Sequence, residues 1–188
     1  MRARSCPEAP LGKHRLRDDM TRPDSSEYAS YYESYVSQVP EGDILAVMRS
    51  ESERMTELLS ALSPEQADHR YEEGKWSIKE VVGHIIDTER MFGYRAHCFA
   101  REDPAQLPGF EQDDYARSSN AGSRSMEELV DELRAVRQSN LAFFHGLDDA
   151  MWSRRGMGSG CEFTVRALAY LIVGHELHHR GILESRYL

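Results

Sequence analysis

A spacing of three and four residues between apolar positions recurs in four long segments of the chain, and this pattern constrains the fold more than any other feature. Such spacing places apolar side chains on one face of an α-helix. The segments cover residues 43–62, 77–101, 125–146 and 162–187. The alternation of apolar and polar residues that is typical of a strand is absent from the sequence. The sequence therefore predicts an all-α fold, a bundle of four helices.

Residues that favour helix starts stand before three of these segments. Asp43 is a candidate N-cap of the first helix. Two pairs have the three-residue spacing of a capping box, Ser77 with Glu80 and Ser125 with Glu128. The stretch "SPEQ" after the first segment has the same spacing and predicts a further, short helix.

The length of 188 residues fits one domain with a single core. Residues 1–27 mix Pro, Arg, Asp and Ser without periodicity and are predicted to be a disordered tail, so that residues 28–188 form the bundle domain. The connection between the second and third helices is too long for a tight turn. Because consecutive helices need not then be neighbours, the sequence favours a crossover in the bundle topology.

Charge and composition argue against several classes of partner. With a net charge of -9, the chain has no general positive field that would attract nucleic acid or anionic lipid. It contains no run of about 18 apolar residues that could span a membrane. The three cysteines, Cys6, Cys98 and Cys161, form no Cys-x-x-Cys pair, and their odd number fits a reducing cytoplasm.

The most informative motif is "VGHELHHRGI" at residues 173–182, which contains three histidines within five positions. Two of them, His175 and His179, fall in the apolar seam of the fourth helix, whose members are Leu168, Ile172, His175, His179 and Ile182. Imidazoles one turn apart on one helix face can direct ring nitrogens at a common metal ion. His178 lies instead on a neighbouring line of mostly small residues, which would let another backbone approach closely.

A metal ion needs a further ligand from another helix. His84, on the flank of the apolar stripe of the second helix, is the best candidate, because a flank position can face a neighbouring helix in a bundle. His97 lies roughly 220° further round the same helix and cannot share an ion with His84. The residues alone leave two interpretations open, a metal site and a set of hydrogen-bonded core histidines.

Two glutamates accompany these histidines. Glu89 lies in the apolar stripe of the second helix, so it needs a buried partner such as an arginine or a role in a cavity, and pairing is the preferred interpretation. Glu176 and His178 are interpreted as a solvated face of the fourth helix.

Four separated blocks, in order between about residue 39 and residue 186, carry a resemblance to a known family: "VPEGDIL", "GKWSIKEVVGHIIDTERMFGYRA", "LPGFEQDDYA" and "GHELHHRGIL". Through them the chain resembles the DinB-like superfamily of metal-dependent helix bundles. The resemblance implies a four-helix bundle with up-down-down-up topology and a divalent metal ion held by His84, His175 and His179. Characterised relatives in this family include thiol-dependent transferases and an isomerase that use low-molecular-weight thiols such as bacillithiol or mycothiol.

A site with three histidine ligands leaves positions open for water or substrate, which indicates a catalytic metal. Imidazole ligands suit zinc, nickel or iron. We expect an enzyme that activates a thiol or water for transfer to a small electrophilic substrate, similar to the thiol transferases of the family. Two alternatives are a metal-dependent hydrolase and a non-catalytic, metal-stabilised interaction module. The protein is expected to be a cytoplasmic homodimer that binds neither nucleic acid nor membranes.

Further residues are candidates for supporting this site. Glu176 or Glu89 would orient a ring N–H of a ligand histidine. The loop from Asp103 to Ser123 would form part of the pocket wall, with Asp114 and Tyr115 as its polar contributors.

Overall fold

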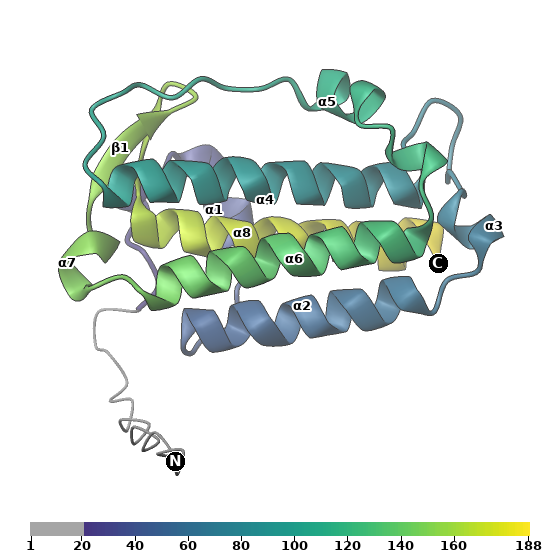
Figure 1. The fold of residues 1–188 in the computed structure, drawn as a ribbon, viewed down its shortest axis with the longest axis horizontal. Coiled ribbons are helices and arrows are strands. Elements are labelled where there is room, and N and C mark those ends of the chain that lie inside the picture. The colour runs from purple at the N-terminus through teal and green to yellow at the C-terminus, as the bar shows by residue number, and fades with distance from the viewer. Residues whose placement is uncertain (1–20) are drawn as a thin grey trace, which may run out of the picture.

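The computed structural model describes residues 21–188, and four long helices dominate that part of the chain (Figure 1). They are α2 (Ile44–Ser60), α4 (Ile78–Ala100), α6 (Met126–His145) and α8 (Val165–Ile182). These helices confirm the four segments predicted from apolar spacing. The shorter elements are α1 (Glu33–Val36), α3 (Pro64–Ala67), α5 (Gln112–Ser118), α7 (Asp149–Trp152), β1 (Arg155–Gly158), β2 (Cys161–Thr164), 3₁₀ turns at Ser25–Glu27, Ser30–Tyr32 and Ala121–Ser123, and a π-helical turn at Leu183–Tyr187.

The helices α2 and α8 run in one direction along the bundle, whereas α4 and α6 run in the opposite direction, as Figure 1 shows. The predicted up-down-down-up topology is therefore confirmed. Because α4 and α6 are parallel, the long connection over residues 101–125 has to run back along α4 before α6 begins. Both α2 and α4 pack against α6 and α8. The consecutive long helices α2 and α4 thus lie at opposite corners of the bundle.

The predicted helix caps are present in the structure. The Asp43 carboxylate accepts a hydrogen bond of 3.0 Å from the backbone N–H of Leu45. Each cap satisfies a backbone N–H that the first helical turn leaves unpaired. Capping boxes open three further helices: Ser63 with Gln66 at α3, Ser77 with Glu80 at α4, and Ser125 with Glu128 at α6.

One prediction about the fold is wrong, because residues expected in a loop and at the start of the fourth helix form a β-hairpin. The strands β1 and β2 pair antiparallel, so that α8 begins only after β2 ends. The two residues between the strands, Ser159 and Gly160, have positive φ angles of 53° and 73°. Positive φ at both central positions is characteristic of the type I′ turn, one of the two tight turns that commonly join hairpin strands. The fold is the predicted helical bundle with one short hairpin added to it.

Tertiary contacts stabilise this hairpin. A Cβ atom on Gly156 would lie 2.0 Å from the Phe99 ring, so β1 packs directly on α4. The backbone N–H of Leu107 donates a hydrogen bond of 2.9 Å to the carbonyl of Met157, and the N–H of Ser159 donates one of 3.0 Å to the carbonyl of Leu107. The strands have four residues each, too few for a period of two to be visible in the sequence. The hairpin holds the start of the long connection beside α4.

Packed structure begins before residue 28, where the sequence places the start of the domain. Glu27 is 4% exposed. Its carboxylate accepts a hydrogen bond of 2.7 Å from the hydroxyl of Thr164 and one of 3.1 Å from the guanidinium of Arg166. These contacts tie the N-terminal segment to the start of α8. The disorder predicted for residues 1–20 concerns a stretch outside the described residues.

Two apolar clusters fill the bundle, and buried polar residues lie between them. On α2, for example, Glu51 stands between Met48 of one cluster and Met55 of the other. The same alternation occurs on α4 and α6. We call this set the polar layer; it contains Glu51, Glu89, Arg137, Asn140 and Glu176.

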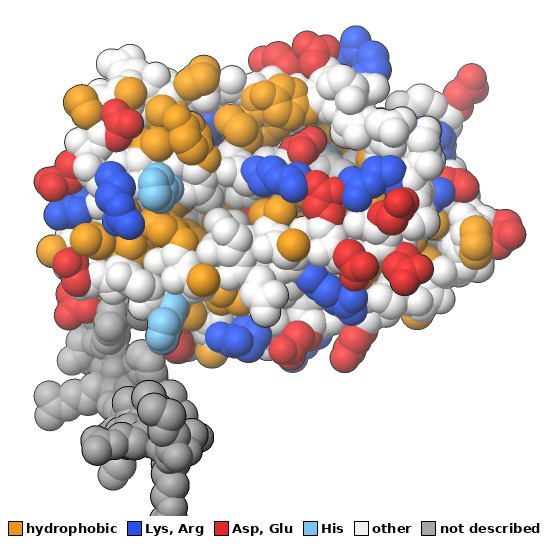
Figure 2. Space-filling model, viewed as in Figure 1, with side chains coloured by type: hydrophobic (Ala, Val, Ile, Leu, Met, Phe, Trp, Pro, Cys, Tyr) orange, Lys and Arg blue, Asp and Glu red, His pale blue; other side chains and the backbone are white. Residues whose placement is uncertain are grey.

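Acidic and basic side chains alternate over the face of the molecule that carries α4 and α6 (Figure 2). One of the ion pairs between these helices joins Arg90 to Glu132 at 2.6 Å. This face of the described residues has no continuous basic surface. Within residues 21–188, no helix combines the length and the apolar character needed to cross a membrane.

Candidate metal centre

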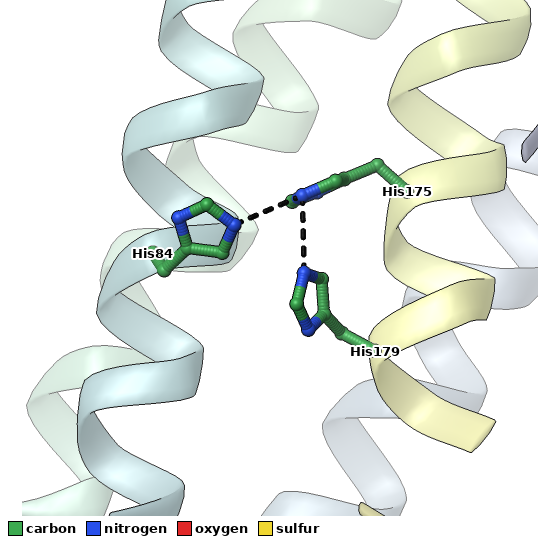
Figure 3. Close-up of side chains that lie close together, drawn as sticks. All are labelled: His84, His175 and His179. Atoms are coloured by element: carbon green, nitrogen blue, oxygen red, sulfur yellow. Dashed lines mark hydrogen bonds between the residues drawn. The ribbon is translucent and has the colours of Figure 1, made fainter. Parts of the chain in front are cut away.

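The antiparallel helices α4 and α8 bring three histidines together (Figure 3). His84 comes from the first half of α4, and His175 and His179 come from successive turns of α8. The Nε2 atoms of His84 and His175 are 3.0 Å apart, and those of His175 and His179 are 3.1 Å apart. One ring nitrogen of each histidine lies within 4.8 Å of the other two. The three residues that the family resemblance implies as ligands therefore converge.

Aromatic side chains enclose these histidines. The ring centroid of Trp76 is 5.0 Å from that of His84, and the ring centroid of Tyr35 is 5.7 Å from that of His175. His84 and His175 are 4% and 6% exposed, whereas His179 is partly exposed. The group is shielded from water at His84 and His175 and reaches solvent at His179.

Burial keeps the three imidazoles neutral at neutral pH, because it penalises the charged form. It lowers the pKa of His84 to about 4 and the pKa of His179 to about 3. Burial, together with the neighbouring histidine rings, also holds the pKa of His175 well below its usual value. Neutral imidazole is the form that binds a metal ion. The three side chains are therefore in their ligating state.

A glycine on α8 makes room for the wall beside His175. The short helix α1, which contains Tyr35, packs against α8. A Cβ atom on Gly174 would lie 2.3 Å from the backbone carbonyl oxygen of Tyr35. This contact confirms the prediction that small residues on this side of the fourth helix admit another backbone. The close approach places the Tyr35 ring against His175 and also against His178, whose ring centroid is 5.1 Å away.

Other histidines lie apart from the converging nitrogens. His178 is half-buried, and its ring contacts those of Tyr35 and His179. His97 contacts Phe143, with ring centroids 5.5 Å apart, in agreement with the prediction that it cannot share an ion with His84. In residues 21–188, the three histidines of Figure 3 form the group whose ligand atoms lie close enough for one ion.

Both glutamates expected to orient a histidine ring are bound to an arginine. Arg137 donates two hydrogen bonds to Glu89, of 2.8 and 2.9 Å, and one of 2.7 Å to Glu176. The interpretation of Glu89 as one half of a buried pair is confirmed. Glu176 is 0% exposed, so its interpretation as part of a solvated face is wrong. Its polar neighbours in the sequence suggested an exposed position, but its partner, Arg137, lies on another helix.

The long connection between α4 and α6 reaches this region through α5, which packs against α4. Asp114 forms an ion pair within α5, and Tyr115 is 42% exposed with its ring against Phe110. Both predicted pocket residues thus make contacts within their own loop. Asp113, which the sequence did not single out, has a charge that acts to raise the pKa of His84, against the larger effect of burial. Its position in the predicted pocket loop, beside Asp114, is the signal that could have indicated it.

A solved structure shares this fold. YfiT from Bacillus subtilis is described as "a probable metal-dependent hydrolase with an unusual four-helix bundle topology". It matches with a TM-score of 0.64 at 16% sequence identity, over 72% of this chain and 79% of that chain. At this identity the likeness establishes the fold, and it agrees with the helix arrangement in Figure 1.

Comparison of sequences identifies the family. A protein of Oceanobacillus iheyensis is 20% identical over 171 residues, which are 90% of this chain and 89% of the relative. A protein of Geobacillus kaustophilus is 24% identical over 143 residues, which are 75% and 80% of the two chains. Both relatives carry the name "Putative metal-dependent hydrolase". The DinB superfamily model matches residues 48–183, a span that includes all three converging histidines. The chain therefore belongs to the DinB superfamily.

Proposed function

We propose that this protein is a metal-dependent hydrolase whose ion is held by His84, His175 and His179. The convergence of three Nε2 atoms, two of which belong to buried histidines, carries the proposal. Three neutral imidazoles suit a divalent transition metal such as zinc, nickel or iron. Three protein ligands also leave a position for water or substrate, which is the arrangement of catalytic rather than closed structural sites.

The contacts among the rings favour a metal ion over a hydrogen-bonded core. The Nε2 atom of His175 lies at hydrogen-bond distance from the Nε2 atoms of both His84 and His179. A neutral ring nitrogen offers either one proton or one lone pair, so it forms a good hydrogen bond with only one of two such neighbours. A cation would be attracted by the lone pairs of all three nitrogens. The three converging nitrogens are therefore better suited to binding a metal ion than to forming hydrogen bonds with one another.

The surrounding residues have definite roles in this proposal. When bound, a divalent ion supplies Lewis acidity and makes water a nucleophile near neutral pH. The rings of Trp76 and Tyr35 exclude bulk water from the buried side of the histidines. The partly exposed His179 marks the side from which a small substrate enters. The carboxylate of Asp113 adds negative charge near His84, which favours a cation at this position.

The names of the relatives favour hydrolysis over the transfer of a low-molecular-weight thiol. Both reactions would use the same three ligands and would differ in the nucleophile. We propose water as the nucleophile and a small electrophile as the substrate. That the protein is a cytoplasmic homodimer which binds neither nucleic acid nor membranes stays a prediction from the sequence.

Elemental analysis of protein purified without an affinity tag tests the metal site. We expect a stoichiometric divalent ion in the wild type, its loss in His175→Ala, and its retention in the control His97→Ala, which changes a histidine of α4 away from the site. Metal at a hundredfold excess over its dissociation constant should stabilise the wild type by about 2.7 kcal/mol. A metal-free wild type whose melting temperature does not respond to zinc, nickel or iron would contradict the proposal.

A panel of small esters, amides and other electrophiles, assayed with and without a small thiol, tests the reaction. Turnover that needs no thiol and is lost in His84→Ala supports a hydrolase. Turnover that requires the thiol would replace hydrolysis by thiol transfer. Stoichiometric metal without metal-dependent turnover on any substrate would indicate the non-catalytic module.

A further inference from the structure

Two pairs of residues form adjacent rows along α8. One row consists of His175 and His179, and the other consists of Glu176 and Arg180, which follow them directly in sequence. Because successive residues of a helix are turned by about 100°, the second row faces more than a quarter turn away from the first. The side chains of the second row therefore point away from the metal site, and they contact other helices.

Glu176 joins α8 to the centre of the bundle. Its Oε2 atom accepts the hydrogen bond of 2.7 Å from Arg137 on α6. The same guanidinium is bound to Glu89 on α4 and donates a hydrogen bond of 2.8 Å to the backbone carbonyl of Met48 on α2. One arginine thus connects all four long helices, and Glu176 is the contact made by α8.

Arg180 makes a corresponding contact one turn later. Its Nη1 atom is 2.6 Å from Oε2 of Glu51 on α2, a carboxylate that is 2% exposed. Glu51 has a second partner in Arg54, with an N–O distance of 2.8 Å. The helix α8 is therefore held by ion pairs at two points one turn apart, and the two points are anchored on different helices.

We propose that Glu176 and Arg180 are positioning residues that fix the rotation of α8 about its axis, so that His175 and His179 face His84. The inference rests on the metal site proposed above. Buried ion pairs on two different helices can favour one arrangement of α8 where apolar packing would tolerate several. A rotation of about 20° would move a side-chain atom about 5 Å from the helix axis by nearly 2 Å, which is more than a metal site tolerates.

Charge and positioning make opposite predictions for Arg180. If only its charge matters, removing a cation close to a divalent ion strengthens metal binding. If Arg180 orients the helix that carries His179, its removal weakens metal binding, as loss of orienting partners does by about 10- to 100-fold. The substitution Arg180→Met keeps an apolar stem, and Glu51 keeps Arg54 as its partner, so it leaves no buried charge unpaired.

Zinc titration of chelator-treated protein against a competing coloured chelator measures the affinity. We expect Arg180→Met to bind zinc at least about tenfold more weakly than the wild type. Its metal-free form should melt close to the wild type, and Arg180→Lys should recover much of the affinity. The matched control is Arg166→Met, which removes an arginine of the same helix that pairs with buried Glu27, roughly 14 Å before His175. It should bind zinc with wild-type affinity.

Wild-type or tighter zinc binding in Arg180→Met would overturn the positioning role while leaving the metal site intact. Failure of the wild type to bind zinc, nickel or iron would instead overturn the proposed function. Where Arg180→Met is unfolded at the titration temperature, Glu51→Gln tests the same contact from α2. Unchanged affinity in that protein would also overturn the inference.

Discussion

At the scale of single residues, the site depends on a glycine, Gly174, at a position where any side chain would be too large. Gly174 lets the backbone of Tyr35 approach α8, with 2.3 Å between the carbonyl oxygen and the place of a Cβ atom. The Tyr35 ring then covers His175. Gly181, seven residues later on the same helix, has no heavy atom within 4 Å of the corresponding position. Alanine substitutions at these two glycines therefore distinguish the effect of close packing on stability from the effect of helix propensity.

Gly174→Ala should lower the free energy of unfolding by about 1–3 kcal/mol, because the added methyl group must displace the backbone at Tyr35. Gly181→Ala should raise it by about 0.5–1 kcal/mol, because alanine favours a helix over the unfolded chain. Urea denaturation followed by circular dichroism measures both. Effects of the same sign in the two proteins would contradict the packing argument.

At the scale of elements, the start of α8 is determined by contacts between segments that are far apart in the chain. Thr164 ends β2, and its hydroxyl oxygen caps α8 by accepting a hydrogen bond of 3.0 Å from the N–H of Ala167. The same hydroxyl donates to Glu27, which also pairs with Arg166. Strand end, helix cap and N-terminal segment thus form one unit.

Glu27 should make stability depend on pH in acid. Burial would raise its pKa, but Arg166 and the hydrogen bonds from the Asp24 amide and the Thr164 hydroxyl hold the pKa below its ordinary value of 4.5. The unfolded state then binds more protons than the folded state as the pH falls through 4.5, so stability decreases.

The comparison of wild type with Glu27→Gln isolates this effect. The difference in their free energies of unfolding should be constant between about pH 7 and pH 5.5 and should shrink as the pH falls through the folded-state pKa of Glu27. Urea denaturation over this pH series measures it. A difference that stays constant into acid would show that the ion pair does not lower the pKa of Glu27.

At the scale of the whole molecule, the polar layer connects the four long helices. Packing within the two apolar clusters is not directional, so it would fix the relative orientation of these helices less strictly. Arg137 is 2% exposed and forms hydrogen bonds with groups on α2, α4 and α8. Burial alone would lower the pKa of Arg137, but the carboxylates of Glu176 and Glu89 raise it above its ordinary value. Such a layer adds little stability compared with apolar packing, while loss of one member leaves buried charges unpaired.

Arg137→Met should therefore destabilise the protein by about 3–5 kcal/mol, since Glu89 and Glu176 lose their common partner. The triple variant Glu89→Leu, Arg137→Met, Glu176→Leu should recover most of this loss, because it removes the buried charges together. Urea denaturation of the metal-free proteins gives both values. A triple variant as unstable as the single one would show that the layer stabilises the fold directly.

Much of the architecture could be predicted because its causes are local. Helix periodicity and the caps at Asp43, Ser77 and Ser125 involve residues within a few positions of one another, and the structure contains them. The i, i+4 spacing placed His175 and His179 on one face for the same reason. The hairpin escaped prediction because short strands carry little periodicity and depend on packing against Phe99.

The helices, their caps and the shared helix face of His175 and His179 follow from local sequence, since backbone geometry relates near neighbours directly. Which distant residues meet depends instead on how the four helices pack. His84 joins His175 across 91 positions, and Arg137 meets Glu89 across 48 and Glu176 across 39. These contacts exist because the packing of four helices places particular turns at the same height along the bundle axis. No local sequence pattern specifies how far one helix is shifted along that axis relative to another.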